Sequence, residues 1–274
     1  IDKCPDTTEG EEVDENGCST SQTDTDGDGV TDDIDKCPDT TEGEEVDENG
    51  CPIQLIYLDE NGITVKCPDS NVGDLLSLNG VTYLVVSNFS LKSLVDNDNE
   101  ICNVCTSKVT DMKSLLLTTG GIIDKSSDYY ECVKTWDVSN VTDMSNMFYG
   151  SITFNTDLRY WDVSKVTNMF RMLTSSSFNQ DISSWDVSSV ENMSGLFSGT
   201  PFNQDISNWD VSNVNNMSNM FTNNSSNQDI SDWDVSNVNN MNGMFSYNDS
   251  FNQDISSWDV SSVENMSGLF ENSI

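Results

Sequence analysis

The C-terminal half of the chain repeats one pattern of apolar and polar positions. In the unit around Trp185, polar residues separate Ile182, Trp185 and Val187, and the alternation of Trp185 with Val187 is typical of a half-buried strand. The next apolar residues have the three- and four-residue spacing of a helix; they are Val190, Met193, Leu196 and Phe197. Gly195 and the run at 198–201 interrupt any long helix. Each unit is therefore predicted to be a short strand, one or two helical turns and a returning loop.

The pattern recurs at a fixed period. Six tryptophans each begin the phrase W-D-V-S-x-V at intervals of 24 or 25 residues; they are Trp136, Trp161, Trp185, Trp209, Trp233 and Trp258. One such unit cannot bury enough apolar surface to fold alone, so units of this length stack on one another. We therefore expect a repeat solenoid with the tryptophans in an interior column. Ser226 stands where other units have Phe154, Phe178, Phe202 or Phe251, and we expect that unit to be looser.

The repeated phrase resembles two known sequence patterns. I-x-x-W-x-V-x-x-V is similar to the leucine-rich-repeat phrase L-x-x-L-x-L-x-x-N, with Trp in place of the second Leu and Val in place of Asn. The longer phrase F-N-x-D-I-x-x-W-D-V-S-x-V-x-x-M-x-x-M-F, across 136–274, resembles the BspA-like (DUF285-type) repeat of bacterial outer-surface proteins. This resemblance implies β/α coils of leucine-rich-repeat type. An irregular first coil contains Val104, and Ile274 stops in mid-coil, so we interpret the chain as a piece of a longer array.

The first 51 residues contain a different, acidic repeat. The sequence IDKCPDTTEGEEVDENGC occurs at 1–18 and again at 34–51, and the phrase D-x-D-x-D-G-x-x-D-x-x-D begins at Asp24. Carboxylates at these positions, with glycine at the sixth, are what a Ca²⁺ loop requires. The predicted ligands are the side chains of Asp24, Asp26, Asp28, Asp32 and Asp35 and the backbone carbonyl of Val30. Asp2 aligns with Asp35 and is predicted to close a second Ca²⁺ loop.

The surroundings of this loop distinguish it from a helix-flanked calcium loop, because no amphipathic helix lies on either side. With the C-P-D-T that follows it, the segment resembles a thrombospondin type 3 repeat in the short form of bacterial surface proteins. The resemblance implies an irregular stalk that Ca²⁺ and disulfides make stiff. An acidic, disordered linker is the alternative.

Eight cysteines, none in zinc-finger spacing, predict four disulfides and an oxidising, extracellular location. The identical copies of the acidic repeat favour the local pairs Cys4–Cys18 and Cys37–Cys51. Cys102 and Cys132 precede equivalent positions on neighbouring coils, whose strands would lie ~4.8 Å apart, so Cys102–Cys132 is the easier bridge and Cys67–Cys105 follows. A C-x-x-C redox pair is the alternative for Cys102 and Cys105, but no thioredoxin-like β-α-β pattern surrounds it.

Residues 52–103 are predicted to form a small α+β cap at the N-terminal edge of the solenoid. Apolar runs at 54–58 and 63–65 flank a polar turn and predict a hairpin, and a second turn leads into a strand at 81–86. A short helix is expected at 88–95. An independent binding domain is the alternative for this segment. The predicted domains are the stalk (1–51), the cap (52–103) and the solenoid (104–274).

The composition excludes several classes of function. A net charge of −36 argues against nucleic acid or anionic lipid as a direct partner, and no apolar run is long enough to insert into a membrane. The chain has no histidine, no nucleophile elbow and no phosphate-binding loop. Its carboxylates repeat on predicted exposed faces instead of converging in a pocket, so catalysis is not expected.

Polar residues also recur in columns along the array. The aspartates that follow the tryptophans are predicted to point outward as a ladder; they are Asp137, Asp162, Asp186, Asp210, Asp234 and Asp259. A second column consists of Asp157, Asp181, Asp205, Asp229 and Asp254. Either serines, asparagines and solvent satisfy these carboxylates within turns, or one column holds cations or forms a polar binding strip. The asparagines Asn179, Asn203, Asn227 and Asn252 are expected to form an internal hydrogen-bond ladder.

The acidic repeat contains D-T-T twice, which resembles the O-glycosylation signal of Bacteroidota and predicts modification of Thr7 and Thr40. Ordinary Asx-turn chemistry is the alternative for both sites.

These features together favour a non-enzymatic extracellular module, in which a Ca²⁺-stiffened stalk presents a solenoid for adhesion to, or recognition of, an unknown protein or glycan. The resemblance points to a bacterial surface adhesin of the Flavobacteriia type, exported by the type 9 pathway. The alternative is a structural segment or subunit of an extracellular fibre, formed by self-association of the solenoids.

Overall fold

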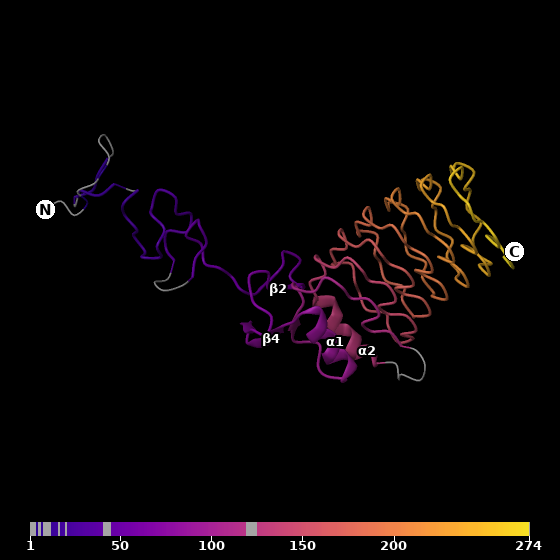
Figure 1. Ribbon diagram of the computed structural model, residues 1–274, viewed down its shortest axis with the longest axis horizontal. Helices are drawn as coiled ribbons and strands as arrows, with labels where there is room; N and C mark the ends of the chain where they lie inside the picture. Colours follow the sequence, from indigo (N-terminus) through magenta and orange to yellow (C-terminus); the bar gives the residue numbers. More distant parts are fainter. Residues whose placement is uncertain are drawn as a thin grey trace. The chain divides into compact units, whose positions relative to one another are not determined.

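The computed structural model of the chain describes most of its length (Figure 1). The described residues are 4, 7, 12–15, 17–19, 21–40, 45–118 and 125–273. The chain divides into two compact units, Ile1–Leu55 and Ile56–Ile274. The boundary lies close to the predicted start of the cap, and residues 56–103 belong to the same unit as the array.

Turns dominate the N-terminal unit. Its described residues form no helix, and the β-bridge recorded among them is antiparallel and joins Val46 to Pro52. Disulfides Cys4–Cys18 and Cys37–Cys51 close equivalent loops in the two copies of the acidic repeat, as predicted. Covalent closure replaces an apolar core here, because a segment this acidic has little apolar surface to bury.

The second unit begins with two small sheets. β1 (Tyr57–Leu58) and β2 (Val65–Lys66) form the expected antiparallel hairpin. β3 (Leu75–Leu78) pairs antiparallel with β4 (Val81–Val85), which pairs in parallel with β5 (Val104–Cys105). Because β5 lies in the first coil, this sheet joins the cap directly to the array.

Three short helical segments complete the cap region. α1 (Asn88–Asp96) is the helix expected from the sequence, and it starts at a capping box in which Ser87 and Ser90 accept each other's backbone amides. α2 (Ser127–Glu131) and the 3₁₀ helix η1 (Cys132–Thr135) were not expected and lead directly into Trp136. The remaining disulfides, Cys67–Cys105 and Cys102–Cys132, have the predicted pairing and fasten these segments to the first coil.

From Asp111 onward the chain winds into successive coils that stack on one another (Figure 1). Parallel single-residue bridges join equivalent positions of neighbouring coils, and they link Asp111, Asp143, Asn168, Asn192, Asn216, Asn240 and Asn265 in that order. A further parallel bridge joins Val65 of β2 to Trp136, so the cap hairpin pairs with the start of the next coil. Each coil is thus held by backbone bonds to the coil before it and the coil after it.

Consecutive amides of a coil alternate between two kinds of hydrogen bond. The amides of Met193, Gly195 and Phe197 donate to carbonyl oxygens of the next coil, at 3.0, 2.8 and 3.1 Å. The intervening amides of Leu196 and Ser198 donate three residues back within their own coil, at 3.1 Å each. This alternation lets one segment turn tightly and pair with its neighbour at the same time.

Apart from β5 in the irregular first coil, the strand and helix predicted for each coil are absent from the described coils. Gly195 has φ of 67°, and the equivalent residue is left-handed in every coil, which ends a right-handed helix after one turn. The strand expected at Trp185 and Val187 does not form either, because the bridges between coils fall later, at Asn192. The periodicity correctly identified the buried positions but misassigned the backbone between them.

The core is a set of stacked side-chain columns. The tryptophans, from Trp136 to Trp258, are buried, and each indole Nε1 donates to a carbonyl of the preceding coil. For Trp209 the acceptor is the carbonyl of Ile182 at 3.2 Å. Phe197, Phe221 and Phe245 stack with ring centroids 5.8 Å apart. Buried indole N–H groups are therefore all satisfied, and the predicted interior tryptophan column is present.

The unit that has Ser226 in place of phenylalanine contains buried amides at that point. Ser226 is 2% exposed, and the side chain of Asn224 accepts from its amide at 2.5 Å. Asn224 also donates to the carbonyl of Thr200 at 2.8 Å, and Asn248 donates to the carbonyl of Ser226 at 3.1 Å. Hydrogen bonds thus replace ring packing there, and the looser packing expected of this unit stays a prediction.

Substitutions at the left-handed positions are predicted to change the free energy of unfolding in opposite directions for glycine and non-glycine residues. Gly243 has φ of 60°, and a Cβ added there would lie 2.7 Å from Oδ1 of Asn219. We expect Gly243→Ala to lower the free energy of unfolding by about 1–2 kcal/mol, because a side chain is strained in this conformation. Arg171 occupies the equivalent position with φ of 52°, so Arg171→Gly should have the opposite sign. Denaturant unfolding of both variants measures the change in the free energy of unfolding. If both substitutions change it in the same direction, the left-handed conformation does not determine stability at this position.

Candidate functional site

Three carboxylates converge in the acidic loop of the N-terminal unit. Asp24, Asp26 and Asp28 each place an oxygen within 4.8 Å of the others. The turn is fixed because Asp24 accepts from the amides of Gly27 and Gly29, at 2.8 and 2.9 Å. Oδ2 of Asp28 is buried and has no hydrogen-bond partner. A buried carboxylate oxygen without a partner is costly, and a bound cation would satisfy it.

The second copy of the acidic repeat closes over this cluster. Gly50, with φ of 74°, has no side chain at a point where a Cβ would collide with the carboxylate of Asp35 and lie 3.0 Å from Oδ2 of Asp28. Asp35 therefore lies next to Asp28 as the loop pattern predicts. Asp26 also contacts the second copy, because its Oδ2 accepts from the amide of Thr40 at 2.7 Å. An all-oxygen set of this kind fits a hard cation such as Ca²⁺.

The other predicted ligands differ from one another. Asp32 is not part of the cluster: its two oxygens accept from Thr23 and Thr25, and these hydrogen bonds lower its pKa. The backbone amide of Val30 donates to Oδ1 of Asp28 at 2.8 Å, so the backbone of Val30 lies next to the cluster. Asp2 lies outside the described residues. The structure thus brings together the first half of the predicted ligand set and Asp35.

The two predicted glycosylation sites occupy equivalent places in the acidic repeats. The hydroxyl of Thr7 lies 2.9 Å from the carbonyl oxygen of Gly17, and that of Thr40 lies 2.8 Å from that of Gly50. Thr40 is 7% exposed. A glycan on Thr40 would require this loop to open, and glycosylation of both residues stays a prediction.

The aspartate columns are fixed by serines of their own coils. Oδ1 of Asp186 accepts from the amide and the hydroxyl of Ser188, at 3.0 and 2.6 Å. Asp181 accepts in the same way from Ser183, at 3.0 and 2.7 Å. Both carboxylates are exposed. In the second column Asp205 and its neighbours line an open groove of about 420 Å³; the other lining residues are Ser207, Gln228, Asp229 and Asp232.

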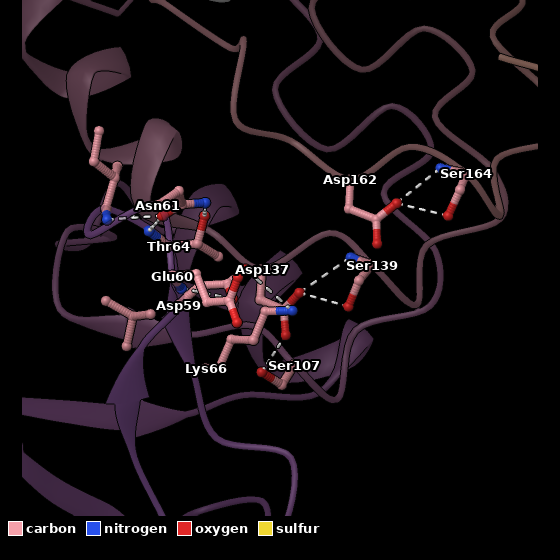
Figure 2. A network of polar contacts seen from close by, with 12 residues as sticks. Asp59, Glu60, Asn61, Thr64, Lys66, Ser107, Asp137, Ser139, Asp162 and Ser164 are labelled. Atoms are coloured by element: carbon pink, nitrogen blue, oxygen red, sulfur yellow. Dashed lines mark hydrogen bonds and ion pairs between the residues drawn. The ribbon is translucent and has the colours of Figure 1, made fainter. Parts of the chain in front are cut away.

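Asp137 differs from the rest of its column, and its predicted outward orientation is wrong. It is 4% exposed because the cap covers it. Its carboxylate accepts from the hydroxyl of Ser107 at 2.5 Å and from the hydroxyl of Ser139 at 2.7 Å (Figure 2). The outward ladder therefore begins at Asp162, whose carboxylate binds Ser164 in the same view.

Lys66 supplies the positive charge beside this buried carboxylate. Its ammonium group forms an ion pair with Asp59 at 3.3 Å (Figure 2). Burial opposes its charged form, but the charges of Asp137 and Asp59 outweigh that effect and raise the pKa of Lys66. The hairpin of β1 and β2 thus compensates the charge that the cap buries.

Hydrogen bonds to the aspartate columns predict acid sensitivity of the array. The hydroxyl and then the amide of Ser188 lower the pKa of Asp186, and lowered values recur along both columns; the other residues are Asp181, Asp205, Asp229, Asp234, Asp254 and Asp259. The pKa values of these aspartates are lower in the folded chain than in the unfolded chain, where they are about 3.9. The hydrogen bonds therefore stabilise the folded chain fully at pH values above about 3.9. That contribution is lost as the pH falls through the folded pKa values.

We therefore expect the guanidinium midpoint of unfolding to fall between about pH 5 and about pH 2. Ser183→Ala combined with Ser188→Ala should make this decline shallower, because both remove bonds to ionised carboxylates. Ser189→Ala, at the next serine, is the control. A decline that is identical in all three proteins would contradict the assigned cause.

The expected asparagine ladder is confirmed. Oδ1 of Asn179 accepts from the amide of Asn203 at 2.9 Å, and Oδ1 of Asn203 accepts from the amide of Asn227 at 3.1 Å. Asn252 continues the ladder, donating its amide to Asn227 at 2.9 Å. The backbone amides of Asn203, Asn227 and Asn252 and the side-chain oxygens that accept from them are therefore committed to bonds between neighbouring coils.

The sequence analysis did not consider the loops that follow the paired apolar residues of each coil. They include Ile152 and Tyr247, which are 65% and 56% exposed. Comparison of the coils with one another would have identified these loops, since the coils differ in length there.

No helix among the described residues is both long enough and apolar enough to cross a membrane. The chain matches one protein family, described as "Mycoplasma protein of unknown function, DUF285", in three overlapping segments: 86–201, 118–226 and 199–274. No curated protein and no solved structure matches the chain. The three segments together cover the whole array and more than half of the chain, which agrees with the resemblance of its repeated phrase. The chain therefore belongs to the DUF285 family.

Proposed function

We propose that the chain is part of a non-catalytic bacterial surface protein, in which a calcium-binding stalk presents a solenoid of leucine-rich-repeat type for adhesion or recognition. The observation that carries the proposal is the unbroken run of bridges from Asp111 to Asn265. Such a stack offers an extended surface on which the same side chains recur, and solenoids use surfaces of this kind to bind partners. The thrombospondin type 3 stalk, the Flavobacteriia-type origin and type 9 export rest on sequence resemblance.

The disulfides support an extracellular location. All eight cysteines are paired, and such bonds persist in oxidising compartments. Antibodies against the array should label intact cells of the source organism as strongly as permeabilised cells. Labelling that requires permeabilisation would overturn the proposed location.

Calcium binding by the stalk is supported by the buried, unpartnered oxygen of Asp28. We expect calorimetric titration of the whole chain with CaCl₂ to give a Kd of about 10⁻⁴–10⁻³ M, as in extracellular modules. Asp28→Asn should abolish this binding, because it removes the charge of a central ligand. Asp33→Asn removes one charge from an exposed residue of the same loop that is outside the cluster, and it should leave the Kd unchanged. Equal losses in both variants would indicate nonspecific attraction.

Recognition by the array is tested with the whole chain immobilised on beads. We expect saturable retention of a protein or glycan in a broad screen, and the retention should not require enzymatic turnover. Filaments that grow from the purified chain without any foreign ligand would instead support the fibre alternative. The absence of both retention and filaments would refute the proposed function.

A further inference from the structure

One loop in each coil varies while the rest of the coil repeats. The phrase W-D-V-S recurs unchanged in six coils, whereas the segment between the paired apolar residues and the next phenylalanine position changes in both length and composition. These segments, here called the loop edge, are 149–153, 174–177, 198–201, 222–225 and 246–250. They contain the extra residue that separates the coils of 25 residues from those of 24. In repeat proteins, insertions of this kind concentrate on one face, which is often the binding face.

The loop edge is continuous. Each loop donates one backbone amide to the loop of the next coil, and the donors and acceptors are Gly150 to Thr174, Ser175 to Ser198, Gly199 to Thr222 and Asn223 to Ser246. These bonds measure 2.8 or 2.9 Å. The loops therefore lie side by side in register, and a ligand that follows the array meets them in succession.

The chemistry of the loop edge differs from that of the aspartate columns. The loops at 174–177, 198–201 and 222–225 contain no charged residue, in a chain whose net charge is −36. Their exposed hydroxyls and amides, which both donate and accept hydrogen bonds, belong to Ser175, Ser177, Asn223 and Ser225. Thr174, Ser176, Thr200 and Asn224 are buried and bond carbonyls of the array itself. Ile152 lies in the first loop and Tyr247 in the last, and both side chains are more than half exposed. The three middle loops thus form an uncharged polar strip, flanked by Ile152 in the first loop and by Tyr247, with the exposed Asp249, in the last.

Tyr247 is the exposed aromatic residue of the loop edge. It has φ of 55°, the left-handed conformation that Gly150, Ser175, Gly199 and Asn223 share at the equivalent position of the other coils. Its ring is not packed in the core. An exposed ring that the core does not use is available to contact a ligand.

We propose that the loop edge binds an extended, uncharged polysaccharide. Sugar hydroxyls match the exposed groups of Ser175, Asn223 and Ser225, and the apolar surfaces of Tyr247 and Ile152 suit the C–H surface of a sugar ring. Coils recur about every 4.8 Å along the edge, close to the length of one sugar unit, so several units can be read in sequence. A protein partner fits less well, because protein interfaces depend on a central apolar cluster, and the two apolar residues here lie in the outermost loops.

The negative charge of the array selects uncharged polysaccharides over acidic ones. The aspartate columns on the same coils keep the surroundings anionic, so sulfated or uronic-acid polymers are repelled. This inference rests on the proposed recognition function and names the partner class.

The test is affinity electrophoresis of the whole chain in gels that contain β-glucan, mannan, galactan or starch, with alginate as the acidic comparison. We expect at least one uncharged polymer to slow the protein and alginate to have no effect. Tyr247→Gly, which relieves backbone strain and so should fold, is expected to weaken that binding at least tenfold, and Ile152→Ser should weaken it further. Binding should also strengthen with oligosaccharide length.

Asp210→Asn, in an aspartate column, is the matched control and should bind like the unaltered protein. Retardation by alginate alone, or equal affinity of the unaltered protein and Tyr247→Gly, would overturn the inference. If the chain captures a protein partner regardless of residue 247, the recognition function stands and the polysaccharide inference fails. If no polymer and no protein binds, both fail.

Discussion

Trp209→Ala should lower the free energy of unfolding by about 3–5 kcal/mol, which is the usual cost of removing a large aromatic side chain from a core. Trp209 is 4% exposed and lies in a coil with neighbours on both sides. The substitution would leave a cavity in the tryptophan column and remove the hydrogen bond that links the indole to the carbonyl of Ile182 in the preceding coil. Both effects act on the contact between successive coils, so the loss should spread beyond one unit.

Two companion variants separate these effects. Trp209→Phe keeps most of the apolar volume and removes one of the two hydrogen bonds to the carbonyl of Ile182, which keeps the bond from the amide of Trp185; it should cost about 0.5–1.5 kcal/mol. Trp258→Ala should cost less than Trp209→Ala, because two apolar side chains of its coil, Val260 and Phe270, are 40% and 46% exposed. Guanidinium unfolding followed by circular dichroism measures all three. Equal losses at Trp209 and Trp258 would show that stacking does not govern stability.

Removing the Cys67–Cys105 disulfide should have the second largest effect, about 4 kcal/mol for a loop of 38 residues in the chain-entropy estimate. Both cysteines are fully buried, in a small cluster with Val65 and Val85. The bond holds β2 against β5, and β2 carries the lysine beside Asp137. Its loss would therefore loosen the cap and expose a buried carboxylate of the first regular coil.

The double variant Cys67→Ala with Cys105→Ala tests this prediction in tryptophan-monitored thermal unfolding. The matched control removes Cys37 and Cys51, which close a loop of separation 14 in the other unit. All six tryptophans lie in the second unit, so the control should leave their transition unchanged. A shift of similar size in both proteins would mean that the two units do not unfold independently.

The buried positions of the array could be predicted from the sequence, but its backbone could not. A period of 24 or 25 residues and an apolar pattern locate the interior residues, because burial is what the pattern records. The same pattern does not report φ. Ser114 and Arg171 are left-handed although neither is glycine or asparagine, so their residue types gave no warning that a helix would fail there. A pattern with mixed spacing was therefore read as a strand and a helix, although it encodes repeated tight turns.

Contacts between segments that are distant in the sequence account for another difference between the predicted and the observed structure. The disulfide pairing was predictable because duplicated loops and adjacent coils place cysteines near one another. The burial of Asp137 was not, since it depends on the cap hairpin, whose position against the coil is set by the bridge from Val65 to Trp136. The sequence placed Asp32 among the calcium ligands, and the nearby hydroxyls of Thr23 and Thr25 bind its carboxylate, so its role as a ligand stays a prediction.

Deletion of one whole coil tests the stacked array most directly. Removing residues 185–208 takes out one full period and brings Trp209 next to Ser184, so its indole can donate to Leu158 as Trp185 does in the intact chain. Removing residues 185–196 deletes half a period and shifts every later column out of register. Far-ultraviolet circular dichroism and guanidinium unfolding of the two deletions are compared. Stacking predicts cooperative unfolding of the whole-coil deletion near the original midpoint and collapse of the half-coil deletion, whereas equal damage in both would contradict it.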